Sequence, residues 1–225
     1  MSFQISKVDA VTFLKGLETA SVDLVVTDPP YESLEEHRSK GTTTRLSHSK
    51  ASSNDWFQIF PNSRFPELFA EIFRVLKKDR HFYMFCDQKT MFVAKPLAEH
   101  AGFKFWKFLV WDKEKIGMGY HYRARHECIL FFEKGKRKLN DLGTADVIRE
   151  PRIYQGYPTQ KPVKVMEVLV AQSTTPHEIV VDPFMGSGTT GIAALSLGCR
   201  FLGNDICEEA VAIAQARLQA VQKNA

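Results

Sequence analysis

The stretch of this sequence best suited to chemistry is Asp28 to Tyr31, an aspartate followed by two prolines and a tyrosine. It follows an apolar run over residues 21–26 that predicts a buried strand. Proline has no backbone N–H, so the two prolines stop the hydrogen-bond ladder of that strand. Asp28 is therefore expected just past the carboxyl end of a strand, which is the edge where open α/β sheets bind ligands.

These residue types suit the activation of an exocyclic amine on a heteroaromatic ring. Such an amine is a weak nucleophile because its lone pair is delocalised into the ring. The Asp28 carboxylate could accept one amine hydrogen and the Pro29 carbonyl the other, which favours a pyramidal nitrogen positioned for attack. Tyr31 could stack on the flat ring. A strand-ending turn with a packed tyrosine has the same sequence, so this stretch alone leaves a purely structural role open.

A second motif lies near the other end of the chain. Residues 178–181 predict a short buried strand, which runs into the glycine-rich stretch Asp182 to Gly188. A helical pattern follows and stops at Gly198. Strand, glycine-rich turn and helix form a cradle for a nucleotide-containing cofactor, because glycines let backbone N–H groups approach a ligand. The next predicted strand ends in Asp205, an acid suited to a ribose diol.

The glycine spacing leaves a second interpretation open, an NAD-dependent oxidoreductase of the Rossmann type. Gly186, Gly188 and Gly191 match the dinucleotide-binding fingerprint, and Asp205 lies near the expected acid. Asp182 argues against it, because a carboxylate there would face pyrophosphate but could neighbour an ammonium group. No hydride-accepting constellation is evident elsewhere. The absence of a Gly-Lys-Ser/Thr sequence excludes a phosphate-binding loop.

The elements around the two motifs predict an α/β fold with a mixed sheet. A strand at residues 3–5, a helix and the strand before Asp28 form a βαβ unit, which argues for parallel strands. The remaining elements are an amphipathic helix at 65–76, a helix around 91–100, and strands at 81–86, 103–111 and 127–132. The last two strands have no helix between them, so they are expected to be antiparallel. Residues 139–152 show no clear period.

Composition predicts an ordinary globular domain. The chain has 225 residues, of which 44% are hydrophobic and 25% charged. A net charge of +4 and a pI of about 8.8 permit a polyanionic partner without requiring one. The sequence has no signal peptide and no apolar run of about 18 residues, which predicts a cytoplasmic protein without membrane contact. The four cysteines form no C-x-x-C pair and the seven histidines are dispersed, so we expect reduced thiols and no metal site.

Two loops and a turn carry cations that could contact a polyanionic partner. Residues 32–55 follow Tyr31 and are rich in Ser, Thr, Lys and Arg, which predicts a mobile basic flap, with plain disorder as the alternative. The expected phosphate contacts are Arg38, Lys40, Arg45 and Lys50 in the flap, Arg123 and Arg125 in the connection 112–126, and Lys136, Arg137 and Lys138 in a later turn. Solvated loops are the alternative for the last two groups.

The two motifs together resemble the S-adenosylmethionine-dependent DNA amino-methyltransferases. Their order, with the catalytic block first and the cofactor block near the C-terminus, is similar to the circularly permuted beta class of that family. Residues 157–162, Tyr-Pro-Thr-Gln-Lys-Pro, resemble the family's His-Pro-Thr-Gln-Lys-Pro element, although Tyr157 departs from the usual histidine. Arg123 to Glu127 resembles the family's Arg…His-Glu segment. The resemblance spans nearly the whole chain.

The resemblance implies a Rossmann-like methyltransferase fold with a mixed, mostly parallel seven-stranded sheet in one domain, residues 1–225. It implies methyl transfer from S-adenosylmethionine to adenine N6 of a base flipped out of double-stranded DNA. Cytosine N4 is the alternative, although the family then usually has Ser in place of Asp28; the chemistry of Asp28 does not exclude it. Intact motifs argue against a catalytically inactive nucleic-acid-binding relative. The sequence does not decide between a monomer and a homodimer.

The resemblance also assigns residues to roles. The catalytic residues that it implies are Asp28, Pro29, Pro30 and Tyr31. The cofactor-binding residues that it implies are Asp9, Ala10, Asp28, Thr159, Gln160, Lys161, Asp182, Phe184, Gly186, Ser187, Gly188, Thr189 and Asp205. Within this set, Asp9 would contact the cofactor adenine and Asp205 the ribose hydroxyls, while residues 159–161 would close the methionine carboxylate end.

Target recognition is expected to be short or relaxed. Relatives read sequence with a dedicated insertion, whereas only residues 32–55 and 134–152 are available here. Reading several base pairs needs several rigid side chains, each bidentate pair supplying about 1–3 kcal/mol of discrimination, and short loops hold few of them in register. Single-molecule sequencing of DNA methylated by the pure enzyme measures this. One modified motif with roughly five or more specified bases would contradict the prediction.

Overall fold

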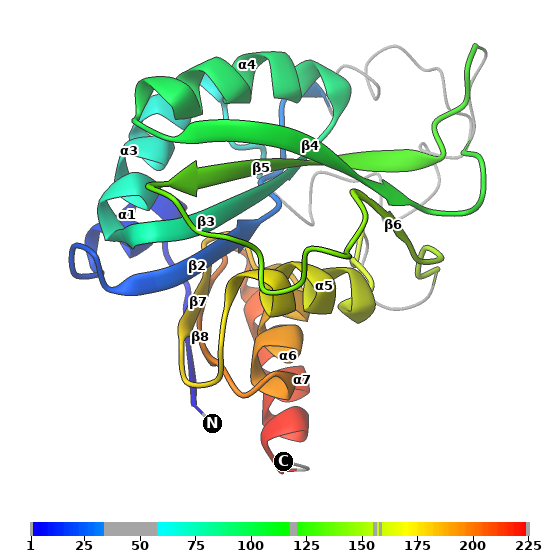
Figure 1. Ribbon diagram of the computed structural model, residues 1–225. Helices are drawn as coiled ribbons and strands as arrows, with labels where there is room; N and C mark the ends of the chain where they lie inside the picture. The colour runs from blue at the N-terminus through cyan, green and yellow to red at the C-terminus, as the bar shows by residue number, and fades with distance from the viewer. Residues whose placement is uncertain (1, 34–57, 118–120, 155–156, 158, 224–225) are drawn as a thin grey trace.

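The computed structural model describes residues 2–33, 58–117, 121–154, 157 and 159–223. These residues form a twisted eight-stranded sheet with helices packed on both faces (Figure 1). The first half of the chain holds β1 (Phe3–Ser6), α1 (Ala10–Lys15), β2 (Val22–Thr27), the 3-10 turn η2 (Asn62–Arg64), α3 (Phe65–Val75), β3 (Leu76–Cys86), α4 (Gln88–His100) and β4 (Lys104–Asp112). The second half holds β5 (His126–Lys134), β6 (Val147–Arg149), α5 (Val163–Ser173), β7 (Ile179–Asp182), α6 (Thr189–Ser196), β8 (Arg200–Asn204) and α7 (Glu208–Lys223).

The strand order is β1-β8-β7-β2-β3-β5-β4-β6, and among the described strands only β5 runs against the others. This confirms the prediction of a mixed, mostly parallel sheet with antiparallel strands on either side of the 112–126 connection. The expected number of seven strands is one too low. The additional strand, β6, has three residues inside the stretch 139–152, which is too short for an alternating pattern to be visible.

The order of the strands brings the two sequence motifs together. β2, which leads into Asp28, lies directly beside β7, which leads into the glycine-rich turn, with Leu24 paired to Val180 and Val25 to Val181. The two strands run parallel to each other, so both end at the same edge of the sheet. The Asp28–Tyr31 motif from the start of the chain and the glycine-rich motif from its end therefore lie at neighbouring strand ends.

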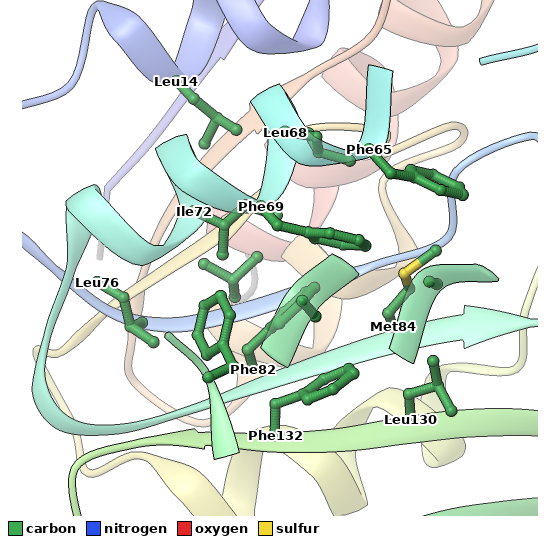
Figure 2. Packing of buried hydrophobic residues seen from close by; sticks show 14 of the residues in the cluster. Leu14, Phe65, Leu68, Phe69, Ile72, Leu76, Phe82, Met84, Leu130 and Phe132 are labelled. Atoms are coloured by element: carbon green, nitrogen blue, oxygen red, sulfur yellow. The ribbon is translucent and has the colours of Figure 1, made fainter. Parts of the chain in front are cut away.

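Aromatic residues dominate the core between α3 and the sheet. Phe65 stacks on Phe69 within α3 at 5.3 Å between ring centroids, and Phe82 of β3 stacks on Phe132 of β5 at 5.4 Å. Figure 2 shows these rings facing one another across the helix–sheet interface. Full burial of such a side chain contributes about 1.5–3 kcal/mol to stability. A second core lies on the opposite face of the sheet, under α5, α6 and α7.

All four cysteines are free, and three of them are buried, as predicted for reduced thiols. No group of described side chains has the arrangement of a metal site. Among the described helices, none is both long and apolar enough to cross a membrane.

A substitution at Gly191 tests how α6 packs against the second core. A Cβ at this position would lie 2.6 Å from the buried ring of Phe201 and 2.8 Å from Leu218. We expect Gly191→Ala to lower stability by about 1–3 kcal/mol, the usual cost of overpacking, in spite of the better helix propensity of alanine. Thermal unfolding measures the effect. Gly16→Ala is the matched control, because Gly16 ends α1 with a φ of −75° and its nearest neighbour atom lies at 3.3 Å. Equal melting temperatures for the two variants would contradict the packing.

Candidate active site

A cavity of about 410 Å³ opens at the carboxyl ends of the parallel strands. Its volume is in the range of small-molecule sites. All four predicted catalytic residues line it, and so do all predicted cofactor residues except Gly188. The wall also contains residues that sequence reasoning did not assign to the site, namely Gln58, Ile59, Phe60, Pro61, Arg64, Glu127, Tyr157, Met166, Pro183, Met185, Thr190, Asn204 and Ile206.

The conformation and packing of Gly188 give it a structural reason to be glycine. It is the N-cap of α6 with a φ of +78°, a conformation that favours glycine. A Cβ there would lie 3.0 Å from the Cβ of Ala214 in α7. Gly188 therefore allows α6 to begin and to pack on α7, and its contact with the cofactor stays a prediction. Gly186 does line the cavity, with a φ of +52°, and among the described residues only Tyr157 lies near its Cβ position, at 3.5 Å.

Asp182 provides a buried carboxylate without a cationic partner among the described residues. Its Oδ1 accepts hydrogen bonds from the Thr27 hydroxyl and the Phe184 N–H, each at 3.0 Å. Its Oδ2 accepts from the Thr190 hydroxyl at 2.7 Å. Burial raises the pKa of Asp182 to about 7, and the three donors lower it by less. A cationic ligand group in the cavity would favour the ionised form.

Two further acids stand at other strand ends around the cavity. Asp205, after β8, accepts from the Gly186 N–H and the Cys207 N–H, each at 2.9 Å, and burial raises its pKa. Asp9 caps α1, and the Arg64 guanidinium donates to both of its oxygens at 2.6 and 2.9 Å. The hydrogen bond from Arg64 is the main cause that lowers the pKa of Asp9 to about 2. Arg64 stands at the start of α3, and no sequence motif marked it.

Asp28 belongs to a chain of alternating charges. Lys161 donates to Asp28 Oδ2, and its Nζ lies 3.3 Å from Glu127 Oε2. Glu127 Oε1 is 2.5 Å from the Nζ of Lys113. Burial raises the pKa of Asp28, and the positive charge of Lys161 opposes that rise. Burial also disfavours charged Lys161, but the two carboxylates raise its pKa overall.

This arrangement gives Lys161 carboxylate partners inside the protein. The resemblance implied that Lys161 would meet the carboxylate of the cofactor, whereas here it bridges Asp28 and Glu127. Glu127 was recognised only as part of the family's His-Glu segment, and its neighbour Lys113 had no sequence signal at all. Their positions beside the cavity follow from the pairing of β5 with β3 and with β4, which the local sequence does not show.

The segment around residue 60 closes one side of the cavity. The Phe60 N–H donates to the Pro30 carbonyl at 2.7 Å, and Asn62 donates to the Glu32 carboxylate at 2.8 and 3.0 Å. Phe60 also meets the ring of Phe184 edge-on at 5.1 Å. The predicted flap between these anchors, with Arg38, Lys40, Arg45 and Lys50, lies outside the described residues.

The other predicted nucleic-acid residues fall at two different edges of the sheet. Lys136, Arg137 and Lys138 follow β5, whose antiparallel direction carries its end away from the cavity: Lys134 pairs with Arg80, and Cys128 with Cys86. Those seven strand positions span about 20 Å. These three cations therefore lie at the edge of the sheet opposite the cavity, and their contact with DNA stays a prediction. Arg123 and Arg125 precede β5 at the cavity edge, and Arg125 pairs with Asp112 at 2.6 Å.

Curated proteins of similar sequence are bacterial methylases by name. The DNA methylase family model, N6_N4_Mtase, matches residues 22–216. YubD of Escherichia coli (strain K12) is 33% identical over 218 residues, which cover 96% of this chain and 89% of YubD. The type II methyltransferase M.HpaI of Haemophilus parainfluenzae is 28% identical, covering 93% of this chain and 72% of M.HpaI. The DNA adenine methyltransferase YhdJ of Escherichia coli (strain K12) is 27% identical, covering 93% of this chain and 80% of YhdJ.

Solved structures agree with these relatives. The M1.HpyAVI–SAM complex superposes with a TM-score of 0.71 at 26% identity, covering 96% of this chain and 99% of that one. The cytosine-N4-specific PvuII DNA methyltransferase has a TM-score of 0.75 at 15% identity, covering 99% and 91%, and so shares the fold. Together with the cavity at the β2–β7 strand ends, these findings show that the chain belongs to the DNA methylase family, as an S-adenosylmethionine-dependent DNA amino-methyltransferase.

Proposed function

We propose that this enzyme methylates the N6 amino group of adenine in double-stranded DNA. The observation that carries the proposal is the position of Asp28, which lines the cavity beside the cofactor turn with 27% of its side chain exposed. Asp28 rather than serine in this motif favours adenine over cytosine N4. The similarity to YhdJ, which is named a DNA adenine methyltransferase, supports the same choice.

The donor set of the cavity fits S-adenosylmethionine, which supplies a methyl group made electrophilic by a positively charged sulfur. Asp182 would face the cationic part of the cofactor, because it has no ion pair of its own among the described residues. Asp205 would bind the ribose hydroxyls. Phe184 and Phe60 offer apolar surface to a flat ring near Asp9. Gly186 keeps the backbone open toward the ligand.

The target base must leave the duplex before Asp28 can reach its amino group. The carboxylate of Asp28 would then accept one hydrogen of the amine and the Pro29 carbonyl the other, which orients the nitrogen lone pair toward the methyl group. As the new N–C bond forms, the nitrogen must lose one proton, and Asp28 is placed to receive it. Lys161 supports this role because its charge favours ionised Asp28 before the transfer. Tyr31 would stack on the base.

Product analysis tests the proposal directly. The enzyme is incubated with labelled S-adenosylmethionine and duplex DNA, the DNA is digested to nucleosides, and the labelled nucleoside is identified. The expected labelled nucleoside is N6-methyldeoxyadenosine. Label on N4 of deoxycytidine would overturn the adenine assignment and leave DNA amino-methylation intact. Folded enzyme that binds the cofactor but leaves no label in DNA nucleosides would overturn the proposal.

Asp28→Ala should abolish methyl transfer and leave cofactor binding nearly unchanged. We expect a loss of at least ~10²-fold in rate, the scale for removing one group that stabilises charge in a transition state. Lys161 keeps Glu127 as its partner in this variant, so the cavity wall should persist. Single-turnover methylation and calorimetric titration with S-adenosylmethionine measure the two quantities. Near-normal turnover would remove Asp28 from the catalytic role.

The affinity for S-adenosylmethionine should rise with pH as Asp182 ionises. Because the pKa of Asp182 is about 7, protonation below that pH removes the charge that attracts the cationic cofactor, while above it the carboxylate is already ionised. We expect binding to weaken by about tenfold between about pH 7.5 and about pH 6. Asp182→Asn should bind weakly and lose this dependence. A flat profile in the wild-type enzyme would show that Asp182 does not titrate against the cofactor.

A further inference from the structure

Tyr154 is an exposed aromatic side chain with two cations near its ring. Its relative exposure is 69%, so the ring contributes little to either core. The Nζ of Lys115 lies 5.8 Å from the ring centroid and the Cζ of Arg152 lies 5.6 Å from it. Lys115 comes from the connection after β4, and Arg152 from the segment after β6. We call these three residues the Tyr154 cluster.

The Tyr154 cluster lies at the cavity edge of the sheet. β6 pairs in parallel with the carboxyl end of β4, with Ile148 opposite Trp111 and Arg149 opposite Asp112. The segment after β6 is fastened there, because the Trp111 indole donates to the Glu150 carbonyl at 2.8 Å and the Glu150 N–H donates to the Asp112 carbonyl at 3.1 Å. Arg152 and Tyr154 therefore follow an anchored backbone rather than a free loop.

The cluster is also linked to the catalytic charges. Lys115 stands two positions after Lys113, which pairs with Glu127 at 2.5 Å, and Glu127 in turn contacts Lys161 beside Asp28. A polymer that presents one of its bases to Asp28 must lie across this edge of the sheet. The chemistry of the cluster fits such a polymer: an aromatic face binds a base, and the flanking cations bind phosphates.

We propose that the Tyr154 cluster is a DNA contact site beside the cavity, an inference that rests on the proposed function. Tyr154 stacks on a base next to the extruded nucleotide, where extrusion leaves a ring face without its neighbour. Lys115 and Arg152 neutralise backbone phosphates on either side of that base. A protein partner fits less well, because burying the ring in an apolar interface would remove water from both cations. Stacking and phosphate contacts accept any sequence, which agrees with relaxed target recognition.

Equilibrium binding to a fluorescent duplex, with S-adenosylhomocysteine present, tests the stacking role. Tyr154→Ala should weaken binding between about fivefold and a hundredfold, the range for losing one base–aromatic stack. Tyr154→Phe keeps the ring and should bind nearly as the wild type does. If the two substitutions weaken binding equally, or if neither does, the stacking assignment is overturned. Unchanged S-adenosylmethionine affinity in both variants establishes that they are folded.

The salt dependence of the same binding tests the phosphate role. The double variant Lys115→Ala/Arg152→Ala should reduce the slope of log affinity against log salt by about 2, one unit for each lost phosphate contact. Lys78→Ala/Lys104→Ala is the matched control, because both lysines are exposed at the strand ends opposite the cavity and their removal takes away the same charge. Equal slopes for the two double variants would overturn the phosphate assignment.

Binding and methylation by the wild type and the Tyr154 variants distinguish an error in this inference from an error in the proposed function. If the wild type methylates duplex DNA and the Tyr154 variants bind and methylate as well as it does, the inference is wrong and the proposed function stands. If the wild type neither binds nor methylates duplex DNA, both are wrong.

Discussion

The ion pairs of Lys161 with Asp28 and Glu127 are the interactions on which the rest of the site depends. They join the end of β2, the start of β5 and the segment before α5, which are far apart in the sequence. A buried charge that loses one of its partners typically costs about 3–5 kcal/mol, so these three elements must keep their relative positions. The sheet provides that constraint, because β3 is hydrogen-bonded to β2 on one side and to β5 on the other.

The cavity contains two carboxylates, partly exposed Asp28 and buried Asp182, whose surroundings also differ in charge. Burial raises the pKa of both Asp28 and Asp182. Asp28 has the ammonium group of Lys161 beside it, whereas Asp182 has only hydroxyl and N–H donors among the described residues. A carboxylate with a fixed counter-charge is kept ionised and ready to accept hydrogen bonds from a neutral amine. A carboxylate without one is better suited to a ligand that brings its own positive charge.

Sequence reasoning located the site because its main residues directly follow predicted strands. Asp28, Asp182 and Asp205 each stand at the carboxyl end of a parallel strand, where period and turn residues make the boundary visible. It did not show that Lys136 to Lys138 lie at the edge opposite the cavity, because the direction of β5 decides which edge they reach and local sequence does not encode that edge. It did not reveal the packing role of Gly188, because the close neighbour of Gly188 is Ala214 of a distant helix. Arg64 and Lys113 had no signal, since their acidic partners, Asp9 and Glu127, belong to other elements of the fold.

The pH dependence of kcat directly tests whether Lys161 keeps Asp28 ionised, on which the function of the site depends most. The rate is measured at saturating DNA and S-adenosylmethionine for the wild type and for Lys161→Met, which replaces the ammonium by an apolar chain of similar length. Glu127 retains Lys113 in the variant. Without the opposing charge, burial should raise the pKa of Asp28 further, so the acid limb of the profile should move to higher pH. An acid limb at the wild-type pH, with only a lower plateau, would contradict the account.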